Sequence, residues 1–401
     1  MRGVVGRAAR AAGCILGCLL GCGTPDRPGL VDDLHRPEPE RSLVDDTQSP
    51  RPDLMSPCGA ATVALDFLRP NLYFAIDASA SMREDIPLGA APDRAPGAPL
   101  LPSDRYGVLA LAIQTLLERV GHRVNYGATL FPTADTACDS GEEVLHLSPG
   151  DAVSFAVSGQ VGPVLSDLMF SINRRTPRGG TPTAGALSAL LPKLRDRGDR
   201  PTYVFLVTDG GPNCDLGAHC GPETCIPTLE RSPIAEGLLC EAPINCCDSA
   251  LFGPQNCLDQ EGSVLAMSAL AEAGVHTFVI GIPGSDAFAS VLDQLALAGG
   301  MARPGTPAYY RVSDAEQLLE TVSQLGLGVA LSCSIQLAAP PPDPTLVNVF
   351  FDGQLVPADP VDGWAFSDAQ TVQLLGNSCA LLKAGEVLQA DIVAGCPVVI
   401  R

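Results

Sequence analysis

Short, fully apolar runs alternate with longer helical segments between residues 58 and 330, and this alternation restricts the possible fold more than any other feature. The strand-like runs are residues 72–76, 124–131, 203–207, 275–280 and 309–312. Helices are expected near residues 109–120, at 161–172, from 181 onward, and at 262–273, 287–298 and 315–325. Apolar strands separated by helices are typical of a mainly parallel sheet with helices on both faces. The sequence therefore predicts an α/β fold with a doubly wound, mainly parallel sheet.

The character of the chain changes after Cys333. A Pro-Pro-Pro run at 340–342 is followed by short strand-like runs at residues 347–351, 364–366, 371–375 and 387–393. We expect a small β-rich C-terminal unit over residues 332–401, cross-linked by Cys379 with Cys396 or by either of them with Cys333. The alternative is a C-terminal flap packed on the main domain.

The first 21 residues have the features of an export signal. Arginines at positions 2, 7 and 10 precede an apolar run over residues 11–20, which is too short to span a membrane. This run ends in Leu-Leu-Gly-Cys, which resembles the bacterial lipobox, whose cysteine becomes the acylated first residue of the mature protein. Cleavage before Cys22 leaves twelve further cysteines, an even number suited to disulfides, whereas cleavage before the second candidate, Cys18, leaves thirteen. We therefore expect lipidation at Cys22 and a location in the cell envelope, at the outer membrane or the cell surface; an ordinary secretory signal is the alternative.

Residues 22–57 are rich in proline and charged residues and contain few large apolar ones. Such a segment buries too little surface to offset the entropy lost on ordering. It is expected to be a disordered tether, followed by the main domain over residues 58–331.

Three polar segments lie after strands or at the entry to a helix, where an open α/β sheet forms its binding crevice. They are Asp77-Ala78-Ser79-Ala80-Ser81, Gly179-Gly180-Thr181-Pro182-Thr183 and Thr208-Asp209-Gly210. These segments offer hydroxyl and carboxylate oxygens, which hard cations such as Mg²⁺ prefer, whereas softer ions favour thiolate or imidazole. Thr181 is also expected to be the N-cap of the helix that Pro182 begins.

The order and residue types of these segments resemble the von Willebrand factor A (VWA) domain and its metal-ion-dependent adhesion site, whose pattern is D-x-S-x-S, then Thr, then Asp. The resemblance covers residues 58–330 and implies a Rossmann-like VWA fold. It also implies that Mg²⁺, or Mn²⁺ or Ca²⁺, is bound directly or through water by Asp77, Ser79, Ser81, Thr181 and Asp209. In this family an open coordination position receives a carboxylate from a partner protein. One departure is Ala80, where the family usually has glycine.

Charge and motif content exclude several functions. With 45 acidic and 25 basic residues the formal net charge is −20, which argues against nucleic acid as a partner. The sequence lacks the G-x-S-x-G, H-E-x-x-H, P-loop and EF-hand patterns, and its five histidines are scattered. We expect a protein-binding adhesion protein with no catalytic residues. A structural envelope protein with a non-functional metal site, and a hydrolytic enzyme, are the alternatives.

Seven cysteines lie in a long insertion over residues 211–261, directly after Asp209. Disulfides are the expected state in an exported chain, and the cysteine spacings do not form the paired knuckles of a zinc site, which is the alternative. Because seven is odd, one of these cysteines should pair outside the insertion, with Cys138 as the expected partner. Cys58 and Cys333, which flank the main domain, could join its two ends. We expect the insertion to shape partner choice, since strand-to-helix connections usually need only about 2–6 residues.

Overall fold

The computed structural model describes residues 63–64, 68–89, 101–133, 138–197, 200–215, 243–245, 248, 253 and 257–395. Residues 52–401 group as one compact unit, separate from residues 1–51. The predicted signal segment, the tether and Cys22 lie outside the described residues, as does most of the Cys-rich insertion. None of the helices in the described ranges combines the length and the apolar character that crossing a membrane requires.

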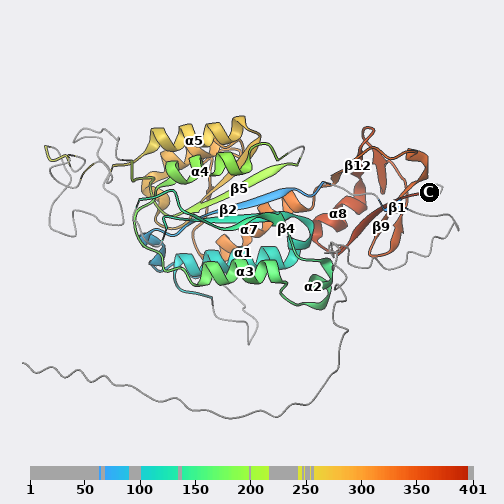
Figure 1. Cartoon of the computed structure of the whole chain (residues 1–401), viewed down its shortest axis with the longest axis horizontal. Helices are drawn as coiled ribbons and strands as arrows, with labels where there is room; N and C mark the ends of the chain where they lie inside the picture. The colour runs from blue at the N-terminus through green and yellow to red at the C-terminus, as the bar shows by residue number, and fades with distance from the viewer. Residues whose placement is uncertain are drawn as a thin grey trace, which may run out of the picture. The chain divides into compact units, whose positions relative to one another are not determined.

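A six-stranded sheet with the order β4-β3-β2-β5-β6-β7 forms the centre of the main domain (Figure 1). Its strands are β2 (Asn71–Asp77), β3 (Asn125–Phe131), β4 (Glu142–Pro149), β5 (Thr202–Thr208), β6 (Val275–Gly281) and β7 (Tyr310–Arg311). All neighbours pair in parallel except β4, which is antiparallel to β3 at the edge. If β2 to β7 are renumbered 1 to 6, the strand order becomes 3-2-1-4-5-6, which is typical of doubly wound folds. The predicted α/β class with a doubly wound, mainly parallel sheet is confirmed.

Helices cover both faces of this sheet because its central strands are apolar on both sides. Alternate residues of β2 enter two different cores: Leu72, Phe74 and Ile76 pack on one face, and Tyr73 and Ala75 on the other. The first core contains residues of α1 (Arg105–Val120), α3 (Pro163–Asn173) and α7 (Ala315–Ala330). The second contains residues of α4 (Thr183–Leu194), α5 (Gln260–Glu272) and α6 (Ala289–Ala298). Figure 1 shows α4 and α5 on one side of the sheet and α1 and α3 on the other.

Two local predictions were wrong. No strand was predicted between residues 131 and 203, but β4 lies there; its side chains are mostly half-buried, and its strand signal is correspondingly weak. Helix α4 begins at Thr183 with Pro182 as its N-cap, so Thr181 is not the capping residue. The short helix α2 (Val153–Ser158) was also missed.

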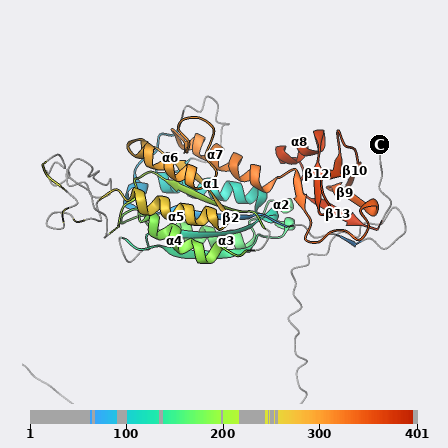
Figure 2. The ribbon, with the colours of Figure 1, turned by 90° about the horizontal axis from the view of Figure 1, so that it is seen from above.

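The C-terminal region is mainly β-structure, as predicted. One sheet has the order β1-β13-β9-β10 and another the order β11-β12-β8. The strands are β1 (Val63–Ala64), β8 (Ser334–Gln336), β9 (Val347–Phe351), β10 (Gln354–Val356), β11 (Trp364–Phe366), β12 (Thr371–Leu374) and β13 (Ala390–Ala394). Figure 2 shows the unpredicted helix α8 (Gly376–Ala384) beside these strands. Strand β1 precedes the main sheet in sequence yet pairs with β13, so the C-terminal sheet includes a segment that the predicted bounds, 58–331, placed in the main domain.

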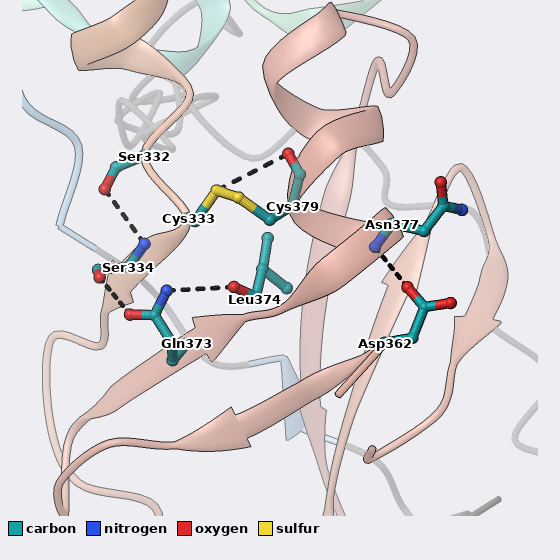
Figure 3. The surroundings of a disulfide bond; sticks show 8 residues. All are labelled: Ser332, Cys333, Ser334, Asp362, Gln373, Leu374, Asn377 and Cys379. Atoms are coloured by element: carbon teal, nitrogen blue, oxygen red, sulfur yellow. Dashed lines mark hydrogen bonds between the residues drawn. A yellow bond between two sulfur atoms is a disulfide. The ribbon is translucent and has the colours of Figure 1, made fainter. Parts of the chain in front are cut away.

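A disulfide joins Cys333, at the end of the main domain, to Cys379 in α8 (Figure 3). This agrees with one of the pairings expected for the C-terminal unit. It also shows that the suggested link between Cys333 and Cys58 was wrong. A hydrogen bond from the Ser334 hydroxyl to Gln373 joins β8 to β12 beside the disulfide, and Gln373 also donates to the Leu374 carbonyl within β12.

Candidate functional site

Two of the five predicted ligand residues lie where the strand order reverses, at the switch point of the sheet. Asp77 is the last residue of β2, and Asp209 directly follows β5, its parallel neighbour. Connections from β2 and β5 run to opposite faces of the sheet here, which leaves a crevice at their carboxyl ends. The topology therefore brings two carboxylates, 132 positions apart in numbering, to one edge of the sheet.

The D-x-S-x-S segment forms a tight turn that continues into the short 3₁₀ helix η1 (Ala80–Arg83). The backbone N–H of Ser79 donates to Asp77 Oδ1 at 2.9 Å, an Asx-type turn that fixes the Asp77 carboxylate. The Thr208 hydroxyl donates to Asp77 Oδ2 at 2.7 Å, so both carboxylate oxygens are held. Thr208 was not among the predicted ligands, and its role is to orient Asp77.

Ser79, Ser81 and Asp209 form a continuous hydrogen-bonded chain. The Ser79 and Ser81 hydroxyls lie 3.1 Å apart, and Ser81 Oγ donates to Asp209 Oδ1 at 2.9 Å. All five predicted ligands are buried: Asp77, Ser79, Thr181 and Asp209 have no exposed surface, and Ser81 is 3% exposed. Five oxygen-bearing side chains are thus enclosed at one place in the fold.

Thr181 joins the group through the backbone of its loop. Ala80 N–H donates to the Gly179 carbonyl at 3.0 Å, and Arg178 N–H donates to the Ala78 carbonyl at 2.7 Å, so this loop lies against the D-x-S-x-S turn. Asn213 also holds the backbone of Thr181, through two hydrogen bonds. Its side-chain oxygen accepts from Thr181 N–H at 2.7 Å, and its backbone N–H donates to the Thr181 carbonyl at 2.9 Å.

Burial makes the ionised form of these carboxyl groups costly. Desolvation, followed by the charge of Asp209, raises the pKa of Asp77 to about 8. Desolvation also raises the pKa of Asp209, and the nearby Arg105 guanidinium partly offsets this effect. A divalent cation would remove both penalties, because it supplies two positive charges to two buried negative ones.

Arg105 is a further residue of the site that sequence reasoning missed, beside Thr208 and Asn213. It is the first residue of α1 and is 6% exposed, although arginine is rarely buried. Its guanidinium forms an ion pair with the Asp209 carboxylate and a second one, at 2.8 Å, with Glu84. A single arginine at a helix start carries no sequence signal that distinguishes it from a surface residue.

The donor set fits a hard divalent cation in its chemistry. Three hydroxyls and two carboxylates are oxygen ligands, which Mg²⁺ and Mn²⁺ take together with water. Within the described ranges, no three or more His, Cys, Asp or Glu side chains gather into a group that could hold a metal ion. A cation here would therefore depend on Ser79, Ser81 and Thr181 as much as on the two carboxylates.

A disulfide lies directly beside this site. Cys138, in the connection between β3 and β4, pairs with Cys214, next to Asn213, with 5.3 Å between the Cα atoms. The predicted link from the insertion to Cys138 is confirmed. Cys257 is also disulfide-bonded, which accords with the oxidised state expected for these cysteines. The other five cysteines of the insertion lie outside the described residues.

The strand order, the switch point and the buried oxygen cluster define a doubly wound domain with a candidate cation site. No protein-family model and no curated protein sequence matches the chain. Among solved structures, the chain is similar to the pilus adhesin SpaC from Lactobacillus rhamnosus GG, with a TM-score of 0.44 and 12% identity over 83% of this chain. The chain spans 40% of the length of that structure.

Two further solved structures each match 66% of this chain. BatB from Bacteroides thetaiotaomicron matches with a TM-score of 0.37 and 15% identity, covering 66% of this chain and 100% of BatB. The manganese-loaded TRAP protein from Plasmodium vivax matches with a TM-score of 0.34 and 16% identity, covering 66% of this chain and 76% of TRAP. Because these identities and scores are low, the function of this chain has to be inferred from its own residues.

Proposed function

We propose that this chain is an exported adhesion protein, anchored in the cell envelope through a lipid on Cys22, that binds a partner protein through a divalent cation. The cation would be held by Asp77, Ser79, Ser81, Thr181 and Asp209, with Mg²⁺ as the first candidate and Mn²⁺ or Ca²⁺ as alternatives. The partner would supply an Asp or Glu carboxylate. We propose no catalytic role and no catalytic residues.

The observation that carries this proposal is the convergence of hydroxyls and carboxylates from three separate connections of the fold. Isolated hydroxyls often serve only as turn or cap residues. Here Ser79, Ser81 and Asp209 contact one another directly in a fully buried cluster, and the backbone of the Thr181 loop is hydrogen-bonded to that of the same turn. Burial of such polar and charged groups is costly unless hydrogen bonds, ion pairs or a bound cation compensate it.

The chemistry that the cation would supply is Lewis-acid attraction for an anionic oxygen. The protein's own contribution is to hold its ligands before binding. Asp77 is fixed by Ser79 N–H and Thr208, and Thr181 is fixed by Asn213. Preorganised ligands lose little entropy on binding, so a partner carboxylate can complete the site at low cost.

Calorimetry with MnCl₂ and MgCl₂ tests this proposal on the mature protein. We expect one site per chain, with binding lost in Asp209→Ala and reduced at least about tenfold, 1.4 kcal/mol, in Ser81→Ala, since each change removes an oxygen ligand. Asp167→Asn, a carboxylate change on the exposed face of α3, serves as the control and should bind like the unmodified chain. Unchanged binding in both Asp77→Ala and Asp209→Ala would contradict the assignment.

Mass spectrometry of the mature N-terminus tests the anchoring. A diacylated or triacylated Cys22 is expected. An unmodified N-terminus further along the chain would indicate a freely secreted protein.

A specific observation also favours the second candidate, a structural envelope protein whose metal site is not used. Arg105 already places a positive charge on Asp209, as a bound cation would. A chain that binds neither Mn²⁺ nor Mg²⁺ but is stable at neutral pH would support this alternative.

A further inference from the structure

Arg105 reaches the candidate metal site from the start of α1. Asp104 caps this helix by accepting from Gly107 N–H, and the Arg105 N–H donates to the Glu84 carbonyl at 3.0 Å. These contacts fix the first turn of α1 against η1. The Arg105 side chain then extends between η1 and the segment that follows β5.

The guanidinium contacts two of the segments that carry the candidate ligands. Nη1 donates to the Ser81 carbonyl at 3.3 Å and to Asp209 Oδ2, and Nη2 forms the ion pair with Glu84 Oε2 at 2.8 Å. Arg105 thus shares Asp209 with Ser81, whose hydroxyl is bound to the other carboxylate oxygen.

The fold leaves space for this guanidinium at Gly284, after β6. Gly284 has a φ of +110°, which other residues rarely adopt, and a Cβ there would lie 3.0 and 3.1 Å from Nη1 and Nη2 of Arg105. A side chain at this position would press on the guanidinium. The buried Nε of Arg105 has no hydrogen-bond partner, so the contacts of the side chain are made by its two terminal nitrogens.

The positive charge of Arg105 explains why this side chain lies beside Asp209. Asp77 and Asp209 are fully buried and close enough to influence each other, and buried charges persist only when they are compensated. The Arg105 guanidinium forms an ion pair with Asp209 and so offsets the charge of that buried carboxylate. A divalent cation that also binds Asp209 would meet this fixed positive charge at close range, and like charges in a buried site repel strongly.

We propose that Arg105 is a resident counter-cation of the metal site. It stabilises Asp209 when no metal is bound, it weakens the affinity of the site for divalent ions, and it keeps a positive charge, partly offset by the half-exposed Glu84, in the metal-bound site that a partner carboxylate approaches. The effects on metal affinity and on the partner carboxylate rest on the proposed function, whereas the stabilisation of Asp209 without metal does not. Arg105 therefore acts on the metal through Asp209, which it positions, and its charge disfavours the binding of a divalent cation.

The first experiment compares Mn²⁺ affinity in the unmodified chain and in Arg105→Gln, which keeps hydrogen-bond donors but removes the charge. We expect the variant to bind Mn²⁺ about tenfold more tightly or better, a change of 1.4 kcal/mol. Arg83→Gln, at the exposed end of η1, also removes one positive charge but does not touch Asp209, so it should change the affinity far less. Equal or weaker Mn²⁺ binding by Arg105→Gln would overturn the proposal.

The second experiment measures melting temperatures in excess chelator. Arg105→Gln should melt lower than the unmodified chain, and adding Asp209→Asn should recover part of the loss, because the unpaired buried charge is then removed. Strictly additive effects would overturn the proposal. If Arg105→Gln is unfolded in chelator, folding on addition of Mn²⁺ supports the proposal, and failure to fold contradicts it.

The outcomes separate this inference from the proposed function. If the unmodified chain binds no Mn²⁺ but Arg105→Gln does, the proposed function fails and the inference stands, with Arg105 replacing the metal. If both bind and the affinities are equal, the inference fails and the proposed function stands. If neither binds, both fail.

Discussion

Asp77 shows how one residue's environment determines the state of the site. Its carboxylate is buried, faces the charge of Asp209 and is fixed by Ser79 N–H and Thr208. Desolvation outweighs these hydrogen bonds and raises the pKa of Asp77 to about 8. Without a metal, Asp77 is therefore mostly protonated near neutral pH, whereas a cation would displace that proton.

This shift predicts an unusual pH dependence of stability. The folded pKa of Asp77 lies above the unfolded value of 3.8, so the folded state binds more protons between about pH 4 and pH 8. In chelator, the stability due to Asp77 protonation should be lost as the pH rises toward 8, and the melting temperature should fall by at least about 2–4 °C, the change that 1 kcal/mol causes in a domain of 150–250 residues.

Thermal melts at pH 5 and pH 8 check this prediction, with Asp77→Asn as the control, because the asparagine does not titrate. The control also removes the contribution of His122, whose pKa is lowered by burial and which acts in the opposite direction below pH 6.5. If the unmodified chain and Asp77→Asn show the same change in melting temperature with pH, Asp77 does not carry the effect. Saturating Mn²⁺ should also reduce the fall toward pH 8.

At the scale of elements, the strongly apolar strands were predictable and the edges were not. Strands β2, β5 and β6 are apolar on both faces, so their sequences identify them without tertiary information. Strand β4 has mostly half-buried side chains, and its pairing with β3 includes register irregularities. Such a strand is stabilised by its neighbour more than by its own composition.

The candidate ligands could be predicted because each directly follows a strand or precedes a helix, and strand ends converge in a parallel sheet. The residues that hold these ligands in place could not be predicted. Asn213 and Arg105 reach the site from a loop and from a helix start, and contacts of this kind depend on the three-dimensional path of the chain. The prediction that Thr181 caps α4 was wrong because Pro182 occupies the N-cap position itself.

The Cys138–Cys214 disulfide links two connections on one side of the site and should affect metal binding. Cys214 has a φ of +76°, a costly conformation for a residue with a side chain, and the adjacent Asn213 holds Thr181. We expect the double variant Cys138→Ser/Cys214→Ser to let Asn213 and Thr181 move and to weaken Mn²⁺ binding several-fold, as measured by calorimetry.

The chain offers a matched control in its other described disulfide. Cys333→Ser/Cys379→Ser should lose similar stability, about 2–4 kcal/mol for a typical disulfide, without a change in Mn²⁺ affinity. Equal affinities for the two double variants would show that the Cys138–Cys214 disulfide stabilises the fold but does not position Thr181.

For the molecule as a whole, the C-terminal β-structure shares a hydrophobic core with the main domain. Trp364, Leu382 and Val387 belong to the same buried cluster as the residues of α1 and α7. The Arg123 guanidinium donates to the Val387 carbonyl, and Leu68 N–H donates to the Gln336 carbonyl at 2.8 Å. These contacts favour the alternative considered from the sequence, in which the C-terminal segment packs on the main domain.

A shared core predicts that the two parts unfold together. The only tryptophan of the chain, Trp364, is 3% exposed and donates to the Val356 carbonyl at 3.0 Å, so its fluorescence reports on the C-terminal part. The longest helices, α1 and α7, belong to the main domain and contribute strongly to far-ultraviolet circular dichroism. We expect both signals to change at the same midpoint in urea, as two-state unfolding requires.

Truncation after Leu331 tests the same coupling from the other direction. Each large apolar side chain that loses its cover costs about 1.5–3 kcal/mol, and each kcal/mol corresponds to about 2–4 °C, so the shortened chain should melt roughly 10 °C lower or fail to fold. Two separate urea midpoints, with a truncated chain that melts like the complete one, would instead identify an independent C-terminal domain. Coincident midpoints, with a truncated chain that melts lower, would show that the C-terminal strands and the main domain unfold as one cooperative unit.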